Sequence, residues 1–393
     1  MLPRGTPDLS WKDLLAGLAY CVRLDSNEQA QKAVEACWPD QATFACLSVR
    51  SGFDLVLQAL ALPAGSEIIV SAITIPHMFE IIERHGLVVV PIDLDEYDLS
   101  IDLQALERAV TPRTKAILIA HLFGSQMPLD EIVAFAKHHN LLLFEDCAQA
   151  YNGSKQCGHP DSDVRMLSFG PIKTATALGG ALISCNDPEL CVHARALQAR
   201  YPRQSRSSFF KRVVQFSLLK LISIRVCYSL FVTICRLRGH DYDQIINRAV
   251  RGFKAGDLFQ RIRQQPSTPL LRLLERRLKQ NGQQQVQRRV ARAQRMRSRL
   301  LSVHWPGSKL TRHSHWVIPI ASDKPEHLMH FLRAHGFDAT RHASTMVAHP
   351  AAQQASAMLD KIVYLPMHPK MSDLEEQRLC SLINELFSKQ QQK

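Results

Sequence analysis

Short apolar runs alternate with segments of helical pattern between about residues 44 and 185. The runs lack the period-two alternation of half-exposed strands, so each predicts a strand buried on both faces, in βαβ units of a parallel sheet. Such sheets bind ligands beyond the carboxyl ends of their strands. The expected strands are Glu67–Val70, Val88–Ile92, Ala116–Ala120, Leu141–Phe144 and Ala181–Ser184. The expected helices are Leu55–Ala61, Met78–His85, Leu103–Ala109 and Leu129–His138.

The composition indicates a folded protein with room for a large and a small domain. The chain has 393 residues, of which 46% are hydrophobic, enough for a sizeable core. Its ten cysteines include no pair with C-x-x-C spacing, and no cluster of histidine, cysteine and aspartate has the spacing of a metal site. No signal-peptide pattern is present at the N-terminus, so a cytoplasmic protein with reduced thiols is expected.

The positive charge is concentrated in one part of the chain. Residues 195–299 hold 25 Lys and Arg against four acidic residues, a balance of +21, whereas the whole chain carries +12 and the remainder therefore −9 (12 − 21). A local excess of this size indicates an anionic partner, such as a membrane surface or an anionic substrate. Aromatic residues are not interleaved with the basic ones, so a nucleic-acid partner is not expected.

The segment Phe209–Leu237 is the most apolar in the chain and lies inside this basic region. Its longest uncharged run, Val226–Cys235, is too short to span a bilayer, which takes about 20 residues. On one helix, polar residues that include Lys211, Arg225 and Arg236 would fall on one side, as in an amphipathic helix lying in a membrane interface. A helix pair that packs at a subunit interface with its arginines in solvent also explains the pattern.

Two residues near strand ends carry the strongest chemical signal. Asp146 follows an expected strand in the segment FEDCAQA, and Lys173 lies about 27 residues further on in SFGPIK. A lysine amine can form a Schiff base with the aldehyde of pyridoxal phosphate (PLP), and a buried carboxylate can keep the pyridine nitrogen protonated. Singly, a helix-capping aspartate and a surface lysine would be ordinary. Together, and with almost no charge around Lys173, they predict a PLP site.

Other residues are candidates for holding the cofactor. Ser168 can donate its hydroxyl to a phosphate oxygen, and Gly179-Gly180 permit close backbone approach. The turn Ser51-Gly52-Phe53 enters a helix whose free backbone amides suit a phosphate group. Gln149, one helical turn beyond Asp146, is placed to reach the ring hydroxyl.

These motifs resemble the DegT-type aminotransferases, PLP enzymes that aminate keto-sugars of nucleotide-linked substrates. The resemblance runs from about Leu47 to Leu386. It rests on EDCAQA at Glu145–Ala150 and on the S-F-x-x-x-K pattern at Ser168–Lys173. Supporting similarities lie in residues 51–60, 111–117, 121–124 and 365–369.

The resemblance implies a fold-type I α/β protein, with a mixed seven-stranded sheet in a large domain, a small C-terminal α+β domain, and a homodimer with active sites at its interface. It makes Lys173 the Schiff-base lysine, Asp146 the partner of the pyridine nitrogen and Gln149 a neighbour of the ring hydroxyl. Relatives that dehydrate sugars carry histidine in place of the lysine, so Lys173 favours amino transfer. The phosphate would be held by Ser51, Gly52 and Ser168.

The sequence departs from the family pattern at several of its cofactor positions. Phe53 stands where the family has threonine, and Ile75 stands where an aromatic ring usually stacks on PLP, a role for which His77 is a candidate substitute. The glycine-rich stretch after the lysine is shortened to Thr174–Gly180. The basic apolar block Arg206–Phe253 also differs from the usual middle region.

Together these observations predict an aminotransferase that moves an amino group, from glutamate by family analogy, to the keto group of a nucleotide-linked sugar or a related carbonyl compound, which can be lipid-like. Asn247 is the candidate for a family asparagine that reaches the partner subunit's site, and His77 and His342 are candidate substrate contacts. Two alternatives are a catalytically altered relative that serves as a membrane-associated scaffold or regulator, and a PLP lyase or dehydratase. The expected location is the cytoplasm, with peripheral contact to the inner membrane surface through residues 209–237 as an alternative to packing.

Four parts are expected along the chain. They are an N-terminal helical segment (1–43), the PLP-binding α/β domain (44–200), a basic amphipathic helical insertion (201–260), and a long helix with a small C-terminal domain (261–393). In the last part the patterns predict a helix over about Leu270–Leu300, strands at Trp316–Ile320 and Lys361–Leu365, and a helix at Lys324–His335 that Gly336 closes.

Overall fold

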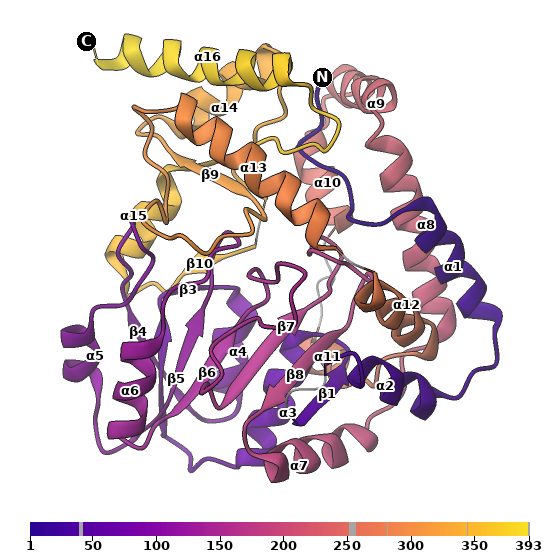
Figure 1. The fold of residues 1–393 in the computed structure, drawn as a ribbon, viewed down its shortest axis with the longest axis vertical. Coiled ribbons are helices and arrows are strands. Elements are labelled where there is room, and N and C mark those ends of the chain that lie inside the picture. Colours follow the sequence, from indigo (N-terminus) through magenta and orange to yellow (C-terminus); the bar gives the residue numbers. More distant parts are fainter. Residues whose placement is uncertain (39–41, 251–256, 281, 344, 392–393) are drawn as a thin grey trace.

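The computed structural model describes the chain except residues 39–41, 251–256, 281, 344 and 392–393. Its centre is a mixed seven-stranded sheet with the strand order β1-β8-β7-β6-β5-β2-β4 (Figure 1). β8 runs antiparallel to both of its neighbours, and the other pairs are parallel. The strands are β1 (Ala42–Cys46), β2 (Glu67–Ser71), β4 (Val88–Ile92), β5 (Thr114–Ala120), β6 (Leu142–Asp146), β7 (Val164–Ser168) and β8 (Ala181–Cys185). The predicted α/β fold with a mixed seven-stranded sheet is confirmed.

Two strands, β1 and β7, are not among those expected from the apolar runs. β7 carries the buried Arg165 in its second position, which interrupts the apolar pattern. The expected strand at Ala181–Ser184 forms, but it is antiparallel to its neighbours rather than parallel. Consecutive parallel strands with a helix between them are found from β2 to β6, and β7 is parallel to β6 although no helix of the described residues lies between them.

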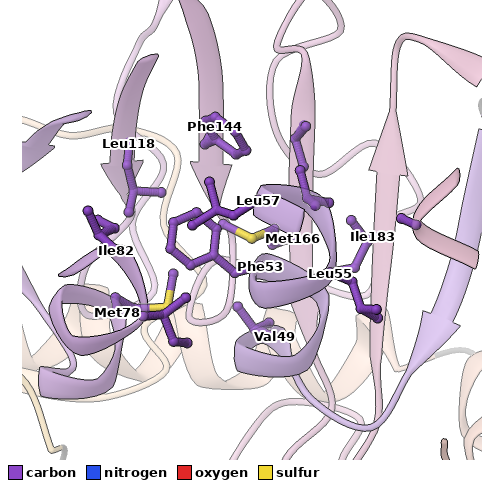
Figure 2. Close-up of a cluster of buried hydrophobic side chains, with 14 of the residues drawn as sticks. Val49, Phe53, Leu55, Leu57, Met78, Ile82, Leu118, Phe144, Met166 and Ile183 are labelled. Atoms are coloured by element: carbon purple, nitrogen blue, oxygen red, sulfur yellow. The ribbon is translucent and has the colours of Figure 1, made fainter. Parts of the chain in front are cut away.

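Helices cover both faces of the sheet. One face is packed by α3 (Val49–Leu60), α4 (Pro76–Arg84), α7 (Pro188–Ala199) and α11 (Leu258–Ile262). In that core Phe53 of α3 meets Phe144 of β6, with Met78, Ile82 and Ile183 around them (Figure 2). The other face is packed by α5 (Leu103–Ala109), α6 (Asp130–His138) and α15 (Gln353–Lys361).

A third cluster joins the N-terminal helices to helices from the second half of the chain. It contains α1 (Trp11–Val22), α2 (Asn27–Glu35), α8 (Arg206–Ile222) and α12 (Thr268–Lys279). Ser10 and Asp13 cap α1 reciprocally, and the buried Asp13 carboxylate also accepts hydrogen bonds from Arg276 and Arg277 of α12. These bonds fix the N-terminal helices against the large domain.

The small C-terminal domain has its own core. It is formed by α13 (Gln283–Arg299), β9 (Ile318–Ala321), α14 (Pro325–Ala334), β11 (Ile362–Leu365) and α16 (Asp373–Gln391). The short strand β10 (Val347–Ala348) pairs with β3 (Ile73–Thr74) of the large domain, so the two domains are joined by backbone hydrogen bonds beside the sheet. The strands and the helix predicted here are present with ends shifted by a few residues, and Gly336 follows α14 with a positive φ of 90°.

One long helix predicted from the sequence is divided in two, and the segment 209–237 also forms two helices. The segment 270–300 is split between α12 and α13 because Gln280 is extended, with ψ 133°, and Gly282 caps the second helix. The segment 209–237 forms α8 and α9 (Arg225–Leu237), which meet at an angle of 95° after the extended residue Ile224. α10 (Tyr242–Val250) follows them.

Within the described residues, no single helix is both long and apolar enough to cross a bilayer. α8 and α9 meet that requirement of length and composition only when they are counted together across their bend. Of the two arrangements that the sequence left open for residues 209–237, the structure has the helix pair rather than one amphipathic helix.

Candidate active site

Asp146 and Lys173 come together at the carboxyl edge of the sheet. Asp146 is the last residue of β6 and is 7% exposed, and Lys173 follows the end of the adjacent strand β7 in a tight turn. The Asp146 carboxylate accepts a hydrogen bond from the Ala148 amide at 2.9 Å. The two side chains lie close enough for each to influence the pKa of the other. The pair that the sequence singles out is thus a pair in space.

Burial favours the neutral form of both groups, so it raises the pKa of Asp146 and lowers the pKa of Lys173. Burial lowers the pKa of Lys173 to about 8, against the opposing effect of Asp146 and with help from Arg50. Burial also raises the pKa of Asp146, although the Ala148 amide and the charges of Lys173, His121 and Arg50 hold it down. A lysine with a lowered pKa carries a reactive free amine at neutral pH.

Trp316 covers the lysine. The Lys173 Nζ lies 4.1 Å from the centre of the Trp316 ring, and the indole Nε1 donates to the Ile172 carbonyl at 2.8 Å. Trp316 comes from the small domain, on the segment that leads into β9. Sequence reasoning placed it in a strand and gave it no role, because nothing in the local pattern links it to a residue more than 140 positions earlier.

The turn at the start of α3 has a different arrangement from the one expected. Ser51 is buried, and its amide and hydroxyl both contact the Ser48 hydroxyl that caps the helix. A Cβ on Gly52 would lie 2.3 Å from the Ile183 side chain, so glycine is needed there for packing against β8. Phe53 points into the core with its ring perpendicular to Phe144 at 5.8 Å. The prediction that Phe53 lines the cofactor is therefore wrong for its side chain.

Arg50, which sequence reasoning missed, lies on the first turn of α3 beside Asp146. Its Nε donates to His77 Nδ1 at 3.1 Å. Burial lowers the pKa of Arg50 to about 10 against the effect of Asp146, and burial together with Arg50 lowers the pKa of His77 to about 4. A cation at a helix N-terminus, just before Ser51-Gly52, is the signal that could have identified it.

Three other predicted residues lie near the site or on its border. Ile75 caps α4, and its half-buried side chain packs against the core rather than presenting an aromatic ring. Gln149 accepts a hydrogen bond from the Phe123 amide at 2.8 Å, and its Nε2 contacts the Met346 sulfur at 2.8 Å. Ser168 ends β7, where its hydroxyl accepts a long 3.4 Å hydrogen bond from the Gly170 amide.

Asn247 and His342 lie apart from the Asp146–Lys173 cluster of their own chain. Asn247 is on α10 and donates to Asp243 at 2.8 Å, within an ion-pair network with Arg4 and Asp338. His342 is exposed in the loop before β10. The reach of Asn247 to a partner subunit and the contact of His342 with substrate stay predictions.

A second cation, Arg289 of α13, lies next to the lysine turn. Its Nε donates to the Ser314 carbonyl at 2.8 Å and its Nη2 to the Thr174 hydroxyl at 3.1 Å. Burial lowers the pKa of Arg289, and the charge of Asp8 opposes that shift. The Ser314 hydroxyl is buried and has no hydrogen-bond partner among the described residues. Sequence reasoning missed Arg289 because it is one of six arginines on the same helix.

Two neutral histidines border this cation. His313 and His315 stack with ring centres 3.9 Å apart, and burial lowers the pKa of His313 to about 2 and that of His315 to about 4. Both histidines are therefore uncharged near pH 7, and Arg289 is the cation of this group.

Behind Asp146, the buried side chains of His121, Glu145 and Cys147 form a group whose geometry would admit a metal ion. Their hydrogen bonds are made within the protein. His121 Nδ1 accepts from the Met127 amide, its Nε2 lies 2.6 Å from the Glu145 carboxylate, and that carboxylate also accepts from Ser162 and from the amide of His159. This network fixes the strand end that carries Asp146.

The mixed seven-stranded sheet and its small C-terminal domain have the fold of solved aminotransferases. A solved aminotransferase, Helicobacter pylori PseC, superposes with a TM-score of 0.72 over 99% of both chains at 16% identity, which shows the fold alone. A model of the DegT/DnrJ/EryC1/StrS aminotransferase family matches residues 26–217. The chain is thus similar to this family over 192 of its 393 residues, just under half of its length.

Curated relatives match in sequence over part of their length. The erythromycin biosynthesis sensory transduction protein EryC1 of Saccharopolyspora erythraea is 38% identical over 160 residues, which are 39% of this chain and 43% of that protein. The GDP-perosamine synthase of Caulobacter vibrioides is 32% identical over 170 residues, 42% of this chain and 45% of that protein. The match thus spans less than half the length of each relative.

Proposed function

We propose that the protein is a PLP-dependent aminotransferase. The observation that carries this proposal is the pair formed by the buried Asp146 and the half-buried Lys173, which follow the carboxyl ends of two adjacent parallel strands. The residues around the pair suit the cofactor: an amine for its aldehyde, a carboxylate for its ring nitrogen, and the α3 N-terminus with Arg50 and Ser51 for its phosphate. Bound there, PLP supplies an electron sink for chemistry at the carbon that carries the amino group.

Lys173 acts first as covalent anchor and then as the group that moves a proton. With a pKa of about 8, roughly a quarter of its amine is unprotonated near pH 7.5, far more than for an ordinary lysine. With the cofactor bound, this amine would be the group that accepts a proton from the substrate carbon and donates it back to the bound amino compound. Asp146 holds the ring nitrogen protonated, and the Ala148 amide fixes the direction of its carboxylate.

Arg289 supplies the cation for the carboxylate of an amino-acid donor. Its Nη1 atom forms no hydrogen bond with any described residue, and Ser314, whose carbonyl accepts from the Arg289 Nε, has a hydroxyl that also lacks a partner among them. A planar guanidinium and a hydroxyl together match a carboxylate. Glutamate is the donor we propose, by analogy with the family.

The acceptor we propose is the keto group of a nucleotide-linked sugar. The name of the GDP-perosamine synthase supports a nucleotide-sugar acceptor, and the basic charge of the chain suits an anionic one. The enzyme would work in the cytoplasm as a homodimer, with Asn247 reaching the site of the partner. The cofactor position at Ile75 would then be completed by an aliphatic contact in place of a stacked ring.

The proposal is tested by absorption spectroscopy of the purified protein mixed with PLP. We expect a near-visible band that shifts when glutamate is added, with release of the corresponding keto acid. Lys173→Ala should lose the band, whereas Lys155→Ala, which changes an exposed lysine nearby, should keep it. A protein that gives no band, or a band that Lys173→Ala retains, would contradict the proposal.

A second candidate function is a PLP-binding or cofactor-free regulator. The core position of Phe53 favours it, because one family donor to the phosphate is absent, and so does the sensory-transduction name of EryC1. A band that forms with PLP but does not change with glutamate or any other amino donor would favour this function over amino transfer.

A further inference from the structure

The helix pair α8–α9 exposes an unusual amount of apolar surface. Eight large apolar side chains on it are between 37% and 82% exposed. They are Phe210, Val214, Leu218 and Leu221 on α8 and Val226, Leu230, Ile234 and Leu237 on α9. A surface of this kind on a folded protein usually marks an interaction site.

On each helix these residues form one continuous stripe. The spacing is four, four and three positions on both helices, which keeps the side chains on one face. The residues that anchor the pair to the protein lie on other faces: Phe209, Val213 and Phe216 on α8, and Tyr228, Val232 and Cys235 on α9. Each helix therefore has two apolar faces. One face packs against the rest of the protein, and the other is exposed.

The charged residues of the helix pair itself are all positive. Residues 206–238 contain seven Lys and Arg and no Asp or Glu. Arg225 pairs with Glu375 and Arg212 donates to the Leu178 carbonyl, so these two belong to the fold. Lys211, Arg236 and Arg238 are exposed and form no ion pair with any described residue. Lys211 and Arg238 each follow a stripe residue directly, which places them beside it.

This combination selects the kind of partner. Exposed apolar stripes flanked by lysine and arginine suit a bilayer with anionic headgroups, where the apolar side chains enter the acyl boundary and the cations meet phosphate. Two copies of this chain meeting through the same face would bring two uncompensated positive surfaces together. α8 and α9, of 17 and 13 residues, are too short to cross the hydrocarbon layer singly.

We propose that α8 and α9 lie flat on an anionic membrane surface, with the stripe of eight apolar residues inserted and Lys211, Arg236 and Arg238 at the headgroups. Figure 1 shows the pair at the border of the molecule, away from the helices that cover the sheet faces. The contact does not depend on the proposed activity. It would place the protein at a membrane whether or not Lys173 carries PLP.

Co-sedimentation with vesicles tests this inference. The full-length protein is mixed with vesicles of phosphatidylcholine alone or with about a third phosphatidylglycerol. We expect sedimentation with the anionic vesicles only, weakened by salt. Leu218→Gln/Leu230→Gln/Leu237→Gln and Lys211→Glu/Arg236→Glu/Arg238→Glu should each weaken the binding at least about tenfold.

The matched control is Val192→Gln/Leu301→Gln/Leu374→Gln, which removes equally exposed apolar side chains from other surfaces. It should bind as the wild type does, and all variants should keep the wild-type circular dichroism. The inference is overturned if the wild type stays in the supernatant with anionic vesicles or if the stripe variant binds unchanged. It is also overturned if sedimentation equilibrium shows that the stripe mediates self-association and vesicles do not compete.

Discussion

Folded proteins usually bury apolar side chains and expose charged ones. Two regions of this molecule depart from that rule in opposite ways: the sheet edge at Asp146 and Lys173, and the helix pair α8–α9. At the sheet edge, charged groups are buried: Asp146 is 7% exposed, and burial moves the pKa of Lys173 well below that of a free lysine. On the helix pair, apolar groups are exposed, with Leu230 at 61% and Leu237 at 82%. Buried charge and exposed apolar surface both cost stability in water.

From this difference we infer that the two regions serve different partners. The sheet edge lies within the segment that matches the family, whereas that match ends inside α8 and does not reach α9. The chemistry we propose is thus shared with relatives, and the surface we propose is a property of this chain's second half. The two can be separated by variants that affect only one of them.

The largest effect is expected for the buried carboxylate. Asp146→Asn keeps the shape and removes the charge that holds the pyridine nitrogen protonated, so kcat should fall about a hundredfold to a thousandfold. The variant should still bind PLP through Lys173 and should still sediment with anionic vesicles. Steady-state kinetics with glutamate check the first point. A kcat within about twofold of wild type would remove Asp146 from the chemistry.

A smaller effect is expected at Arg289. Arg289→Met removes the cation for the donor carboxylate and should raise KM for the amino donor by roughly ten- to a hundredfold, with a smaller change in kcat. Arg288→Met, which changes the exposed neighbour on the same helix, serves as the control. Equal kinetics for the two variants would show that Arg289 only holds the loop at Ser314.

The pH dependence of PLP capture tests the buried lysine. Only the unprotonated amine reacts, so a pKa of about 8 means that this form is present above pH 8 and is lost as the pH falls through it. The capture rate should rise about tenfold for each pH unit below about 7 and level off above about 9. Stopped-flow absorbance measures it. A rate still rising tenfold per unit near pH 10 would indicate an ordinary lysine.

The smallest effect is expected on the stability of the helix pair. Leu230→Ala should change the free energy of unfolding by less than about 0.5 kcal/mol, since the side chain is exposed. Leu57→Ala, in the core beneath the sheet, should cost about 2–5 kcal/mol. Chemical denaturation compares them. A similar loss for both would mean that the α9 stripe supports the fold rather than a partner.

The sequence predicted the sheet and the central pair because their signals are local. Apolar runs identify β2, β4, β5 and β6, and a carboxylate after a buried strand identifies Asp146. β7 was missed because Arg165 interrupts its pattern. The direction of Phe53 could not be read from the turn, since a residue on the first turn of a helix can face ligand or core according to the packing of the helix on the sheet.

The remaining site residues come from distant parts of the chain. Trp316 reaches Lys173, and Arg289 reaches the adjacent Thr174, only because the small domain folds back over the sheet edge. No local pattern distinguishes Arg289 from its neighbours on α13. The break at Gly282 was missed for a related reason. The helical pattern continues across it, so the pattern alone predicts one long helix, and for residues 209–237 it left one helix and a helix pair open.

The measurement that tests the central claim most directly is peptide mass spectrometry after the protein is incubated with PLP and reduced with borohydride. The account predicts a phosphopyridoxyl mass on the peptide that contains Lys173, and on no other lysine in comparable yield. Complete labelling of a different lysine, or an unmodified Lys173 peptide at saturating PLP, would contradict it.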